Sequence, residues 1–509
     1  MLVKKNVTEL STSHLDTSFT SVYSDTTSLV ITVINCSPSS IVFPNMKGYQ
    51  LMEKSGWEKL LKSQKDFFWT GRSRDLNFRI DSLNKLKVAI KTYEKEILEA
   101  VYNDLHKTAF DAYATEVGLI YDEIHFALKN LHTWAKPEKV KTPVFIWPAK
   151  SYIQKEPYGV TLIIAPWNYP FQLLMSPLVG AITAGNTAIL KPSEVSTYTA
   201  DVIEKIINNT FPEEYLRVVQ GDVAQTQALL ELPVDYIFFT GSVTVGKVIV
   251  NAAARHLTPF TLELGGKSPA IVCPDANLRH AAQKIAWGKF LNAGQTCIAP
   301  DFVLVHDSIK NDFLAELKKV ILKFYGENPA EHQRYCRIIN DRHFQRLNGL
   351  LNAANIFSGG KINPADRYIE PTILHPAQWD DLVMQDEIFG PLLPVLVFSE
   401  ISDIIRKINE RPKPLALYLF SDDRFIQKRV TEEIAYGGGA INNTIVHVAS
   451  HFLPFGGVGP SGIGCYHGKA SFDTFTHLKS IVKSSVRFDM GLAHPDKNAW
   501  MRLLKMILK

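Results

Sequence analysis

The spacing of hydrophobic and polar residues changes several times along this chain of 509 residues. Between residues 56 and 102, apolar residues recur every three or four positions, as in amphipathic helices, with a polar break at residues 70–75. From residue 158 onward, short uninterrupted apolar runs alternate with longer segments of helical spacing. Such runs are typical of strands that are buried on both faces of a parallel sheet.

Six of these runs predict strands in two separate sheets. The first group comprises residues 160–165, 187–190, 216–219 and 236–239. The helices expected among them comprise residues 171–184, 200–208 and 245–254. The second group, residues 270–273 and 302–305, flanks a helix expected at residues 278–290. Because successive strand and helix units favour doubly wound parallel sheets, we predict an α/β fold with two lobes.

The same patterns predict where the chain divides. Residues 1–45 are rich in Ser and Thr and lack helical spacing, so we expect them to be disordered or not translated, with Met46 as the alternative start. The segments expected after this extension are a first lobe at 46–262, a second lobe at 263–440, a return to the core at 441–485 and a basic tail at 486–509.

Composition narrows the expected partners and surroundings. The chain carries 55 basic and 51 acidic residues, so no strong basic field favours nucleic acid, and small metabolites are the expected ligands. Its five cysteines form no CxxC pair, which argues against a disulfide framework and a zinc site and favours a reducing cytoplasm. No apolar run approaches the roughly 18 to 20 residues that a membrane-spanning helix requires.

A glycine-bounded turn lies between the strand at 236–239 and the helix that follows it. Its residues are Gly241, Ser242, Val243, Thr244, Val245 and Gly246. Backbone N–H groups and the dipole at a helix N-terminus suit a pyrophosphate, although the spacing departs from GxGxxG and plain turn chemistry is the alternative. Lys191 and Glu194 follow another strand at the edge where open α/β sheets bind ligands, and they either reach ribose hydroxyls or form a solvated loop.

Four further residues are candidates for chemistry. Cys297 lies in a polar, glycine-containing stretch typical of an accessible loop, and it is either a nucleophile or a small buried hydrophobic residue. Glu263 precedes two glycines, and its carboxylate could activate water or form a structural ion pair. Asn168 follows the first buried strand, where its amide could stabilise an oxyanion or cap the backbone. Glu387, taken alone, is a charged residue before a turn.

Seven segments occur in one order along the chain: PWNYP, AGNTAILKPSE, FTGSVTVG, LELGGKSP, NAGQTC, EIFGP and PFGGVGPSG. Together they resemble the aldehyde dehydrogenase superfamily over residues 57–483. SYIQKEPYGV, GSVTVG and GKASFDTFTH are most similar to the class 3, fatty-aldehyde branch. The resemblance implies the aldehyde dehydrogenase-like fold, with a Rossmann-type NAD-binding lobe at 46–262, a catalytic α/β lobe at 263–440 and a small oligomerisation segment within 441–485.

The resemblance also implies roles for the candidates. Cys297 would be the nucleophile and Glu263 the general base, while Asn168 and the Cys297 backbone N–H would form the oxyanion site. The implied cofactor contacts are Glu387 and Phe389 for the nicotinamide ribose, Lys191 and Glu194 for the adenosine ribose, and Gly241–Gly246 for the pyrophosphate. The implied reaction oxidises a medium-chain, long-chain or aromatic aldehyde to its carboxylic acid with NAD, or NADP, through a cysteine thioester. The resemblance further implies a homodimer without a metal.

Three other functions compete with this interpretation. A CoA-acylating dehydrogenase or acyl-CoA reductase of the same fold would transfer the acyl group to a thiol, and the presence of Glu263 argues against it. A non-catalytic binding relative need not keep a nucleophile, a base and an oxyanion donor together. A papain-like thiol hydrolase is disfavoured because no histidine accompanies Cys297 in a recognisable motif.

The end of the chain, residues 496–509, places five apolar side chains on one face of an expected helix. They are Trp500, Leu503, Leu504, Ile507 and Leu508. Arg502, Lys505 and Lys509 lie elsewhere on the helix, so the tail either binds peripherally to an anionic membrane or docks on the protein itself. We therefore expect a cytoplasmic protein, with peripheral membrane contact as the open question.

Overall fold

The computed structural model describes residues 54–487 and 501–507. The extension expected at residues 1–45 lies outside these ranges, as do Trp500 and Leu508 of the expected tail face. No helix within the described ranges has the length and apolar character needed to cross a bilayer.

The helices predicted near the start of the chain are confirmed. The polar break separates α1 (Lys54–Trp69) from α2 (Leu76–Leu105), and a short 3-10 turn lies between them. The Asp75 carboxylate accepts a hydrogen bond from the Phe78 N–H, which caps the start of α2. The chain then continues through α3 (Ala109–Ala112), the π-helical turn η2 (Tyr113–Val117) and α4 (Gly118–Trp134).

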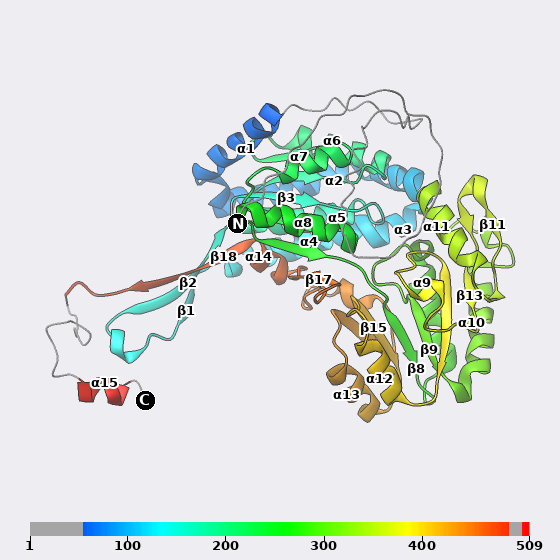
Figure 1. The fold of residues 1–509 in the computed structure, drawn as a ribbon. Coiled ribbons are helices and arrows are strands. Elements are labelled where there is room, and N and C mark those ends of the chain that lie inside the picture. Colours follow the sequence, from blue (N-terminus) through cyan, green and yellow to red (C-terminus); the bar gives the residue numbers. More distant parts are fainter. Residues whose placement is uncertain (1–53, 488–500, 508–509) are drawn as a thin grey trace, which may run out of the picture. The chain divides into compact units, whose positions relative to one another are not determined.

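The first lobe is built on a six-stranded sheet in the order β17-β7-β6-β3-β4-β5. Figure 1 labels β3 and β17 of this sheet. Its strands are β3 (Val160–Ile164), β4 (Thr187–Lys191), β5 (Leu216–Val218), β6 (Tyr236–Thr240), β7 (Phe260–Glu263) and β17 (Gly462–Ile463). Neighbouring strands are parallel except β17, which runs antiparallel to β7. The parallel sheet predicted for this lobe is therefore confirmed, and β17 belongs to the segment that was expected to return to the core.

Helices cover both faces of this sheet. One face packs against α2, α5 (Gln172–Ala184) and α6 (Thr197–Thr210), and the other packs against α1, α7 (Val223–Leu230) and α8 (Val243–His256). Consecutive residues of β3 contact opposite layers of helices. Ile163 belongs to the hydrophobic cluster on the face covered by α2, α5 and α6, and Leu162 belongs to the cluster on the face covered by α1, α7 and α8. Both side chains are fully buried, which explains why this strand is an uninterrupted apolar run.

The second lobe has its own seven-stranded sheet, in the order β10-β13-β14-β9-β8-β15-β16. Its strands are β8 (Pro269–Val272), β9 (Phe302–His306), β10 (Ile356–Ser358), β13 (Thr372–Leu374), β14 (Leu392–Phe398), β15 (Ala416–Phe420) and β16 (Gly438–Ile441). Its helices are α9 (Leu278–Phe290), α10 (Lys310–Tyr325), α11 (Asp341–Asn352), α12 (Ile401–Asn409) and α13 (Arg424–Glu433). Only β10 pairs antiparallel, so the second α/β lobe is also confirmed.

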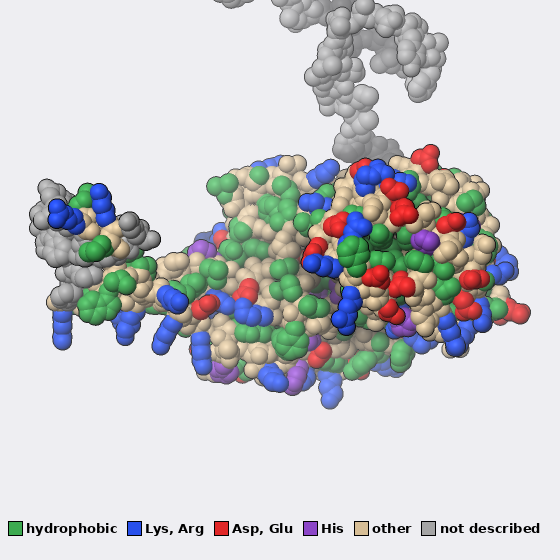
Figure 2. All heavy atoms as spheres, turned by 90° about the horizontal axis from the view of Figure 1, so that it is seen from below, with side chains coloured by type: hydrophobic (Ala, Val, Ile, Leu, Met, Phe, Trp, Pro, Cys, Tyr) green, Lys and Arg blue, Asp and Glu red, His purple; other side chains and the backbone are tan. Residues whose placement is uncertain are grey.

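A separate three-stranded antiparallel sheet contains β1 (Glu138–Val140), β2 (Lys150–Pro157) and β18 (Thr476–Lys483). β18 lies in the segment expected to mediate oligomerisation, whereas β1 and β2 come from a stretch for which no strand was predicted. β18 pairs with β2 along its whole length. Figure 2 shows basic side chains along this sheet with hydrophobic ones between them; the exposed hydrophobic residues include Val140, Leu478 and Val482.

Shorter elements complete the described chain. They are β11 (Ile362–Asn363), β12 (Tyr368–Ile369), α14 (Lys469–Thr474) and α15 (Met501–Ile507). α14 packs against α5 and α4, which joins the end of the family-like region to the first lobe. α15 falls within the predicted amphipathic tail.

Candidate active site

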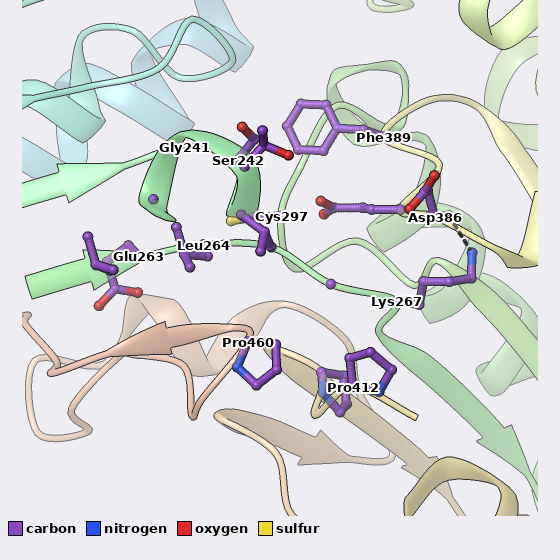
Figure 3. A pocket seen from close by; sticks show the side chains of 18 of the residues that line it. Gly241, Ser242, Glu263, Leu264, Lys267, Cys297, Asp386, Phe389, Pro412 and Pro460 are labelled. Atoms are coloured by element: carbon purple, nitrogen blue, oxygen red, sulfur yellow. Dashed lines mark hydrogen bonds between the residues drawn. The ribbon is translucent and has the colours of Figure 1, made fainter. Parts of the chain in front are cut away.

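A cavity of about 1290 Å³ opens where the carboxyl ends of β6 and β7 meet loops of the second lobe (Figure 3). Ten of the predicted site residues line it: Asn168, Gly241, Ser242, Val243, Thr244, Gly246, Glu263, Cys297, Glu387 and Phe389. Lys191, Glu194 and Val245 do not line it. Residues from both lobes therefore meet at one cavity, and the two residues predicted for the adenosine ribose lie outside its lining.

The glycine-bounded turn forms the N-terminus of α8. The helix begins at Val243, and the Ser242 hydroxyl accepts a hydrogen bond from the Val245 N–H at 3.3 Å. The first N–H groups of a helix have no carbonyl partner one turn earlier, so they can bind phosphate oxygens. A Cβ would lie 2.5 Å from the Phe239 ring at Gly241 and 2.8 Å from Leu264 at Gly246, so a larger residue at either position would require that neighbour to move.

Lys191 ends β4 and Glu194 follows it, at the same edge of the sheet. The Lys191 side chain is 1% exposed, and its Nζ donates to the Pro192 carbonyl at 2.7 Å. The same Nζ lies 3.7 Å from the Glu194 carboxylate, which is one-third exposed. Burial lowers the pKa of Lys191, and Glu194 opposes that change. The two residues are thus already paired, with only the carboxylate open to solvent.

The loop before Cys297 has an unusual backbone. Asn292, Ala293 and Gly294 adopt positive φ angles of 54°, 52° and 75° in succession, which is unfavourable for residues with a Cβ. Hydrogen bonds from the buried Gln295 side chain hold this conformation. Its amide donates to the Asn292 and Arg337 carbonyls, both at 3.0 Å, and its oxygen accepts from a backbone N–H of the second lobe. Strain of this kind, held by surrounding contacts, is common at functional sites.

Cys297 reaches the cavity from this loop. Burial raises the pKa of its thiol to about 12, and the nearby carboxylates of Glu387 and Glu263 add to the effect. Backbone N–H groups of Cys297 and Ile298 act in the opposite direction by donating toward the sulfur. The thiol is therefore protonated at neutral pH in this state, and it must lose its proton before it can act as a nucleophile.

Asn168 contacts the loop that precedes Cys297. The residue is 2% exposed, and its Nδ2 donates to the Gln295 carbonyl at 3.0 Å. The Asn292 side chain donates to the Asn168 carbonyl at 2.9 Å, so the two loops are joined in both directions. A side-chain amide carries two N–H donors, and this geometry uses one of them. The second N–H forms none of the hydrogen bonds described here.

Glu263 ends β7 and is 2% exposed. Neither carboxylate oxygen has a hydrogen-bond partner within the described part of the chain. Burial without a partner raises the pKa of Glu263 well above its ordinary value, so this carboxyl group holds its proton more firmly than an exposed glutamate does. Figure 3 shows Glu263 and Cys297 apart, with Leu264 between them in this view. A raised pKa and unpaired oxygens suit a group that accepts a proton from water.

Glu387 and Phe389 approach the cavity from the second lobe. The Glu387 carboxylate lies over Gly265, where an added Cβ would be only 2.2 Å from its oxygen. Burial raises the pKa of Glu387 to about 8, and Asp301 adds to the shift. Phe389 has a left-handed backbone conformation, with a φ of 49°. Its ring packs edge to face against the Trp167 ring, and the two ring centres are 5.4 Å apart. The missing Cβ at Gly265 is thus what admits Glu387 to the cavity.

Several residues that support this loop were not predicted from the sequence. Asp301 accepts a hydrogen bond from the Ile388 N–H at 2.9 Å and pairs with Lys267. Arg346 donates to the Ile388 carbonyl at 2.6 Å. Lys267 lies within the LELGGKSP segment, whose match to the family could have singled it out. Asp301 and Arg346 carry no comparable signal, because each is an ordinary charged residue until the chain is folded.

These features together fit a dinucleotide. The cavity contains a helix N-terminus that can bind phosphate, and a carboxylate admitted by a glycine lies at its other side. Its volume exceeds the roughly 300 to 1,000 Å³ of a typical small-molecule pocket. Within the described ranges, no group of three or more His, Cys, Asp or Glu side chains could hold a metal ion. The fold and the cavity define a two-lobed α/β enzyme that uses a nucleotide cofactor.

The sequence pattern of the aldehyde dehydrogenase family matches residues 45–481, so the chain belongs to this family. It is 50% identical over 454 residues to the 4,4'-diaponeurosporen-aldehyde dehydrogenase of Staphylococcus aureus, covering 89% of this chain and 99% of that relative. It is 44% identical to the dimeric NADP-preferring aldehyde dehydrogenase of Mus musculus, covering 85% and 96%. A substrate-bound state of Staphylococcus aureus AldH superposes with a TM-score of 0.88 at 50% identity, covering 89% and 99%.

The predicted family, fold and enzyme class are therefore confirmed. The chain is an aldehyde dehydrogenase; one relative is NADP-preferring by name, and two of the similar solved structures are complexes with NAD. The resemblance to the class 3 branch is also confirmed, because a family 3 member from Pongo abelii is 46% identical over 420 residues, covering 82% of this chain and 87% of that one.

Proposed function

We propose that the enzyme oxidises its aldehyde through a thioester on Cys297. The observation that carries this proposal is the convergence of a cysteine thiol, an amide donor and an unpaired carboxylate on one cavity that also fits a dinucleotide. Cys297 is the nucleophile, Asn168 and the Cys297 backbone N–H stabilise the oxyanion, and Glu263 is the general base. None of these roles requires a metal.

The first half of the reaction forms the acyl-enzyme. Cys297 passes its thiol proton to solvent water, and the thiolate sulfur attacks the carbonyl carbon of the aldehyde to give a tetrahedral alkoxide. The free N–H of the Asn168 amide donates to that oxygen, and a donor of this kind typically contributes about 10²–10³-fold in rate. NAD or NADP, when bound, accepts the hydride that leaves this carbon. The C–O bond then regains its double-bond character, and the acyl group remains on the sulfur as a thioester.

The second half releases the acid. Glu263, as its carboxylate, takes a proton from water, and the resulting hydroxide attacks the thioester carbon. The C–S bond breaks, the carboxylic acid leaves, and the Cys297 thiolate is restored. The raised pKa of Glu263 makes its carboxylate a strong base, because the proton it accepts is held firmly in a buried site. A CoA thiol as acceptor would need no such base, which favours hydrolysis over acyl transfer.

Adenosine binding is assigned to Lys191 and Glu194 at the sheet edge, with Gly241–Gly246 on the pyrophosphate and Glu387 and Phe389 on the nicotinamide ribose. Glu194 would accept a hydrogen bond from a ribose 2′-hydroxyl and repel a 2′-phosphate, so we propose that NAD is used at least as well as NADP. The name of the 4,4'-diaponeurosporen-aldehyde dehydrogenase relative supports an apolar substrate, and we propose a medium-chain, long-chain or aromatic aldehyde.

We propose that the enzyme is a homodimer. The outer edge of β18 has no strand partner among the described residues, and the same holds for the outer edge of β16. Long edge strands with exposed apolar side chains such as Leu478 and Val482 favour pairing with another chain. Light scattering should show a dimer for the wild type and a monomer for Leu478→Glu/Val482→Glu; a dimer in both would refute this interface.

We also propose a cytoplasmic location with peripheral membrane contact through the tail. In α15, Met501 and Met506 are exposed, and Arg502 and Lys505 supply positive charge. A short helix of this composition gives only a weak anchor to an anionic bilayer. Flotation with anionic vesicles should recover more intact protein than protein lacking residues 496–509, and equal recovery would remove this part of the proposal.

The thioester is tested directly by intact-protein mass spectrometry. The wild type, mixed with aldehyde and NAD and quenched rapidly, should carry an acyl adduct that maps to Cys297. Cys297→Ala should carry no adduct and form no reduced cofactor. A rate comparison over straight-chain and aromatic aldehydes would then define the substrate. An adduct that persists in Cys297→Ala would overturn the assignment of the nucleophile.

A further inference from the structure

A buried ion pair from the N-terminal helices lies behind the loop that carries Asn168. Lys107 follows α2, and Glu116 lies in the π-helical turn η2; Nζ and Oε1 are 2.6 Å apart. Their side chains are 2% and 0% exposed. Burying two charges costs free energy that their attraction returns only in part, so stability alone is a weak reason for such a pair. The other contacts of these two side chains indicate a second role for the pair.

The Glu116 carboxylate supplies the N-terminal cap that α5 lacks. The N-cap residue of α5 is Phe171, whose side chain cannot accept a hydrogen bond, and the first turn contains no acidic residue. Glu116 Oε2 instead accepts from the N–H groups of Phe171 at 2.9 Å and Gln172 at 3.4 Å. A negative charge at the positive end of the helix dipole is favourable, and it fixes the chain shortly after Asn168.

Lys107 holds the same loop from its other side. Its Nζ lies 4.0 Å from the centre of the Tyr169 ring, a cation–π contact in a buried site. The Tyr169 hydroxyl and the Thr296 hydroxyl are 2.7 Å apart and share a hydrogen bond. Tyr169 is the neighbour of Asn168 in the chain, and Thr296 is the neighbour of Cys297. The ion pair therefore connects to both loops through one aromatic side chain.

We propose that Lys107 and Glu116 are positioning residues for the oxidation of the aldehyde. By capping α5 and holding Tyr169, the pair sets the distance between the Asn168 amide and the Cys297 sulfur. This inference rests on the proposed roles of Asn168 and Cys297. Neither member of the pair touches the reacting atoms, so its loss should slow the formation of the acyl-enzyme and leave the affinity for NAD unchanged.

The test is a double-mutant cycle with Asn168→Ala. Lys107→Met/Glu116→Gln removes both charges together and leaves no uncompensated buried charge. In the enzyme that retains Asn168, it should slow the burst of reduced cofactor by about 10²-fold, the size of effect expected for a misplaced catalytic group. In the Asn168→Ala background, the same change should slow the burst by less than about threefold, because the donor that it positions is absent.

A matched control is Lys205→Met/Glu96→Gln, which removes an exposed ion pair of 2.7 Å between α6 and α2 and should leave the burst rate unchanged. Any of three results would overturn the inference. These are equal slowing of the burst in both Asn168 backgrounds, an unchanged burst rate in the Lys107/Glu116 variant, and a slower burst in the control. A wild type without an acyl adduct on Cys297 would instead refute the proposed function.

The Lys107/Glu116 variant is first checked for cooperative thermal unfolding and for NAD affinity by fluorescence titration. If it does not fold, Tyr169→Phe takes its place in the same cycle with the same criteria, since it removes only the hydroxyl that contacts Thr296. Weaker NAD binding in a variant that folds would show a general disturbance of the cavity and would also overturn the positioning role.

Discussion

Glu263→Gln is expected to stop the enzyme halfway through its reaction. The side chain is almost fully buried, and neither of its oxygens has a partner within the described ranges, so replacement by an amide of the same shape breaks no contact there. The amide cannot take a proton from water. Loss of a general base typically costs about 10²–10⁴-fold, or about 2.7 to 5.4 kcal/mol in the barrier to hydrolysis.

The expected kinetic pattern is a burst followed by a stall. Stopped-flow absorbance should show up to about one reduced cofactor per active site, and intact-protein mass spectrometry should show the acyl adduct accumulating on Cys297. If Glu263 also helps to remove the thiol proton, the burst is slower but the adduct still accumulates. Cys297→Ala is the control, with neither burst nor adduct. Steady turnover at the wild-type rate by Glu263→Gln would refute this reasoning and make Glu387 the first alternative base.

Three other changes follow from the same geometry. The pKa of Glu263 is about 4.5 in the unfolded chain and well above that value in the folded enzyme. Between these two pKa values, the folded enzyme keeps a proton that the unfolded chain releases. The free energy of unfolding should therefore fall as the pH rises through this window, by up to about 1.4 kcal/mol per pH unit. Thermal unfolding of Glu263→Gln should lack that contribution, and parallel pH curves for the two proteins would contradict it. Gly265→Ala places a Cβ against the Glu387 carboxylate, so kcat/KM for NAD should fall about tenfold or more, and unaltered kinetics would show that Glu387 does not need this space. Glu194→Gln should raise kcat/KM for NADP relative to NAD, because a negative charge near the 2′-phosphate is removed; an unchanged ratio would place 2′ recognition elsewhere.

The structural elements that could be predicted are those whose sequence pattern involves residues close together in the chain. The apolar run at β3 and the helical spacing of α2 and α8 depend on residues a few positions apart, and these elements were found where the sequence placed them or within a few residues. The pair of strands β1 and β2 was missed because the exposed faces of this sheet give no alternating apolar pattern.

The functional residues divide in the same way, into those that sequence motifs indicated and those that only the folded structure revealed. Family motifs singled out Cys297, Asn168 and Glu263, and the fold brings all three to one cavity. They gave no reason to select Lys107 or Glu116, since a lysine and a glutamate nine positions apart in a helical region normally lie in solvent. Only packing shows that both are buried and that one of them caps a helix from another part of the chain.

By itself, the sequence determined six of the buried strands, several of the helices between them, the two-lobed α/β class and the residue types available for chemistry, because these follow from local periodicity and short motifs. The tertiary structure decided which groups meet. Asn168 Nδ2 contacts the Gln295 carbonyl across 127 residues of chain, and the raised pKa of Glu263 arises from burial by many distant neighbours. Such contacts depend on how the whole core packs, and the electrostatics of the site depend on how much water that packing excludes.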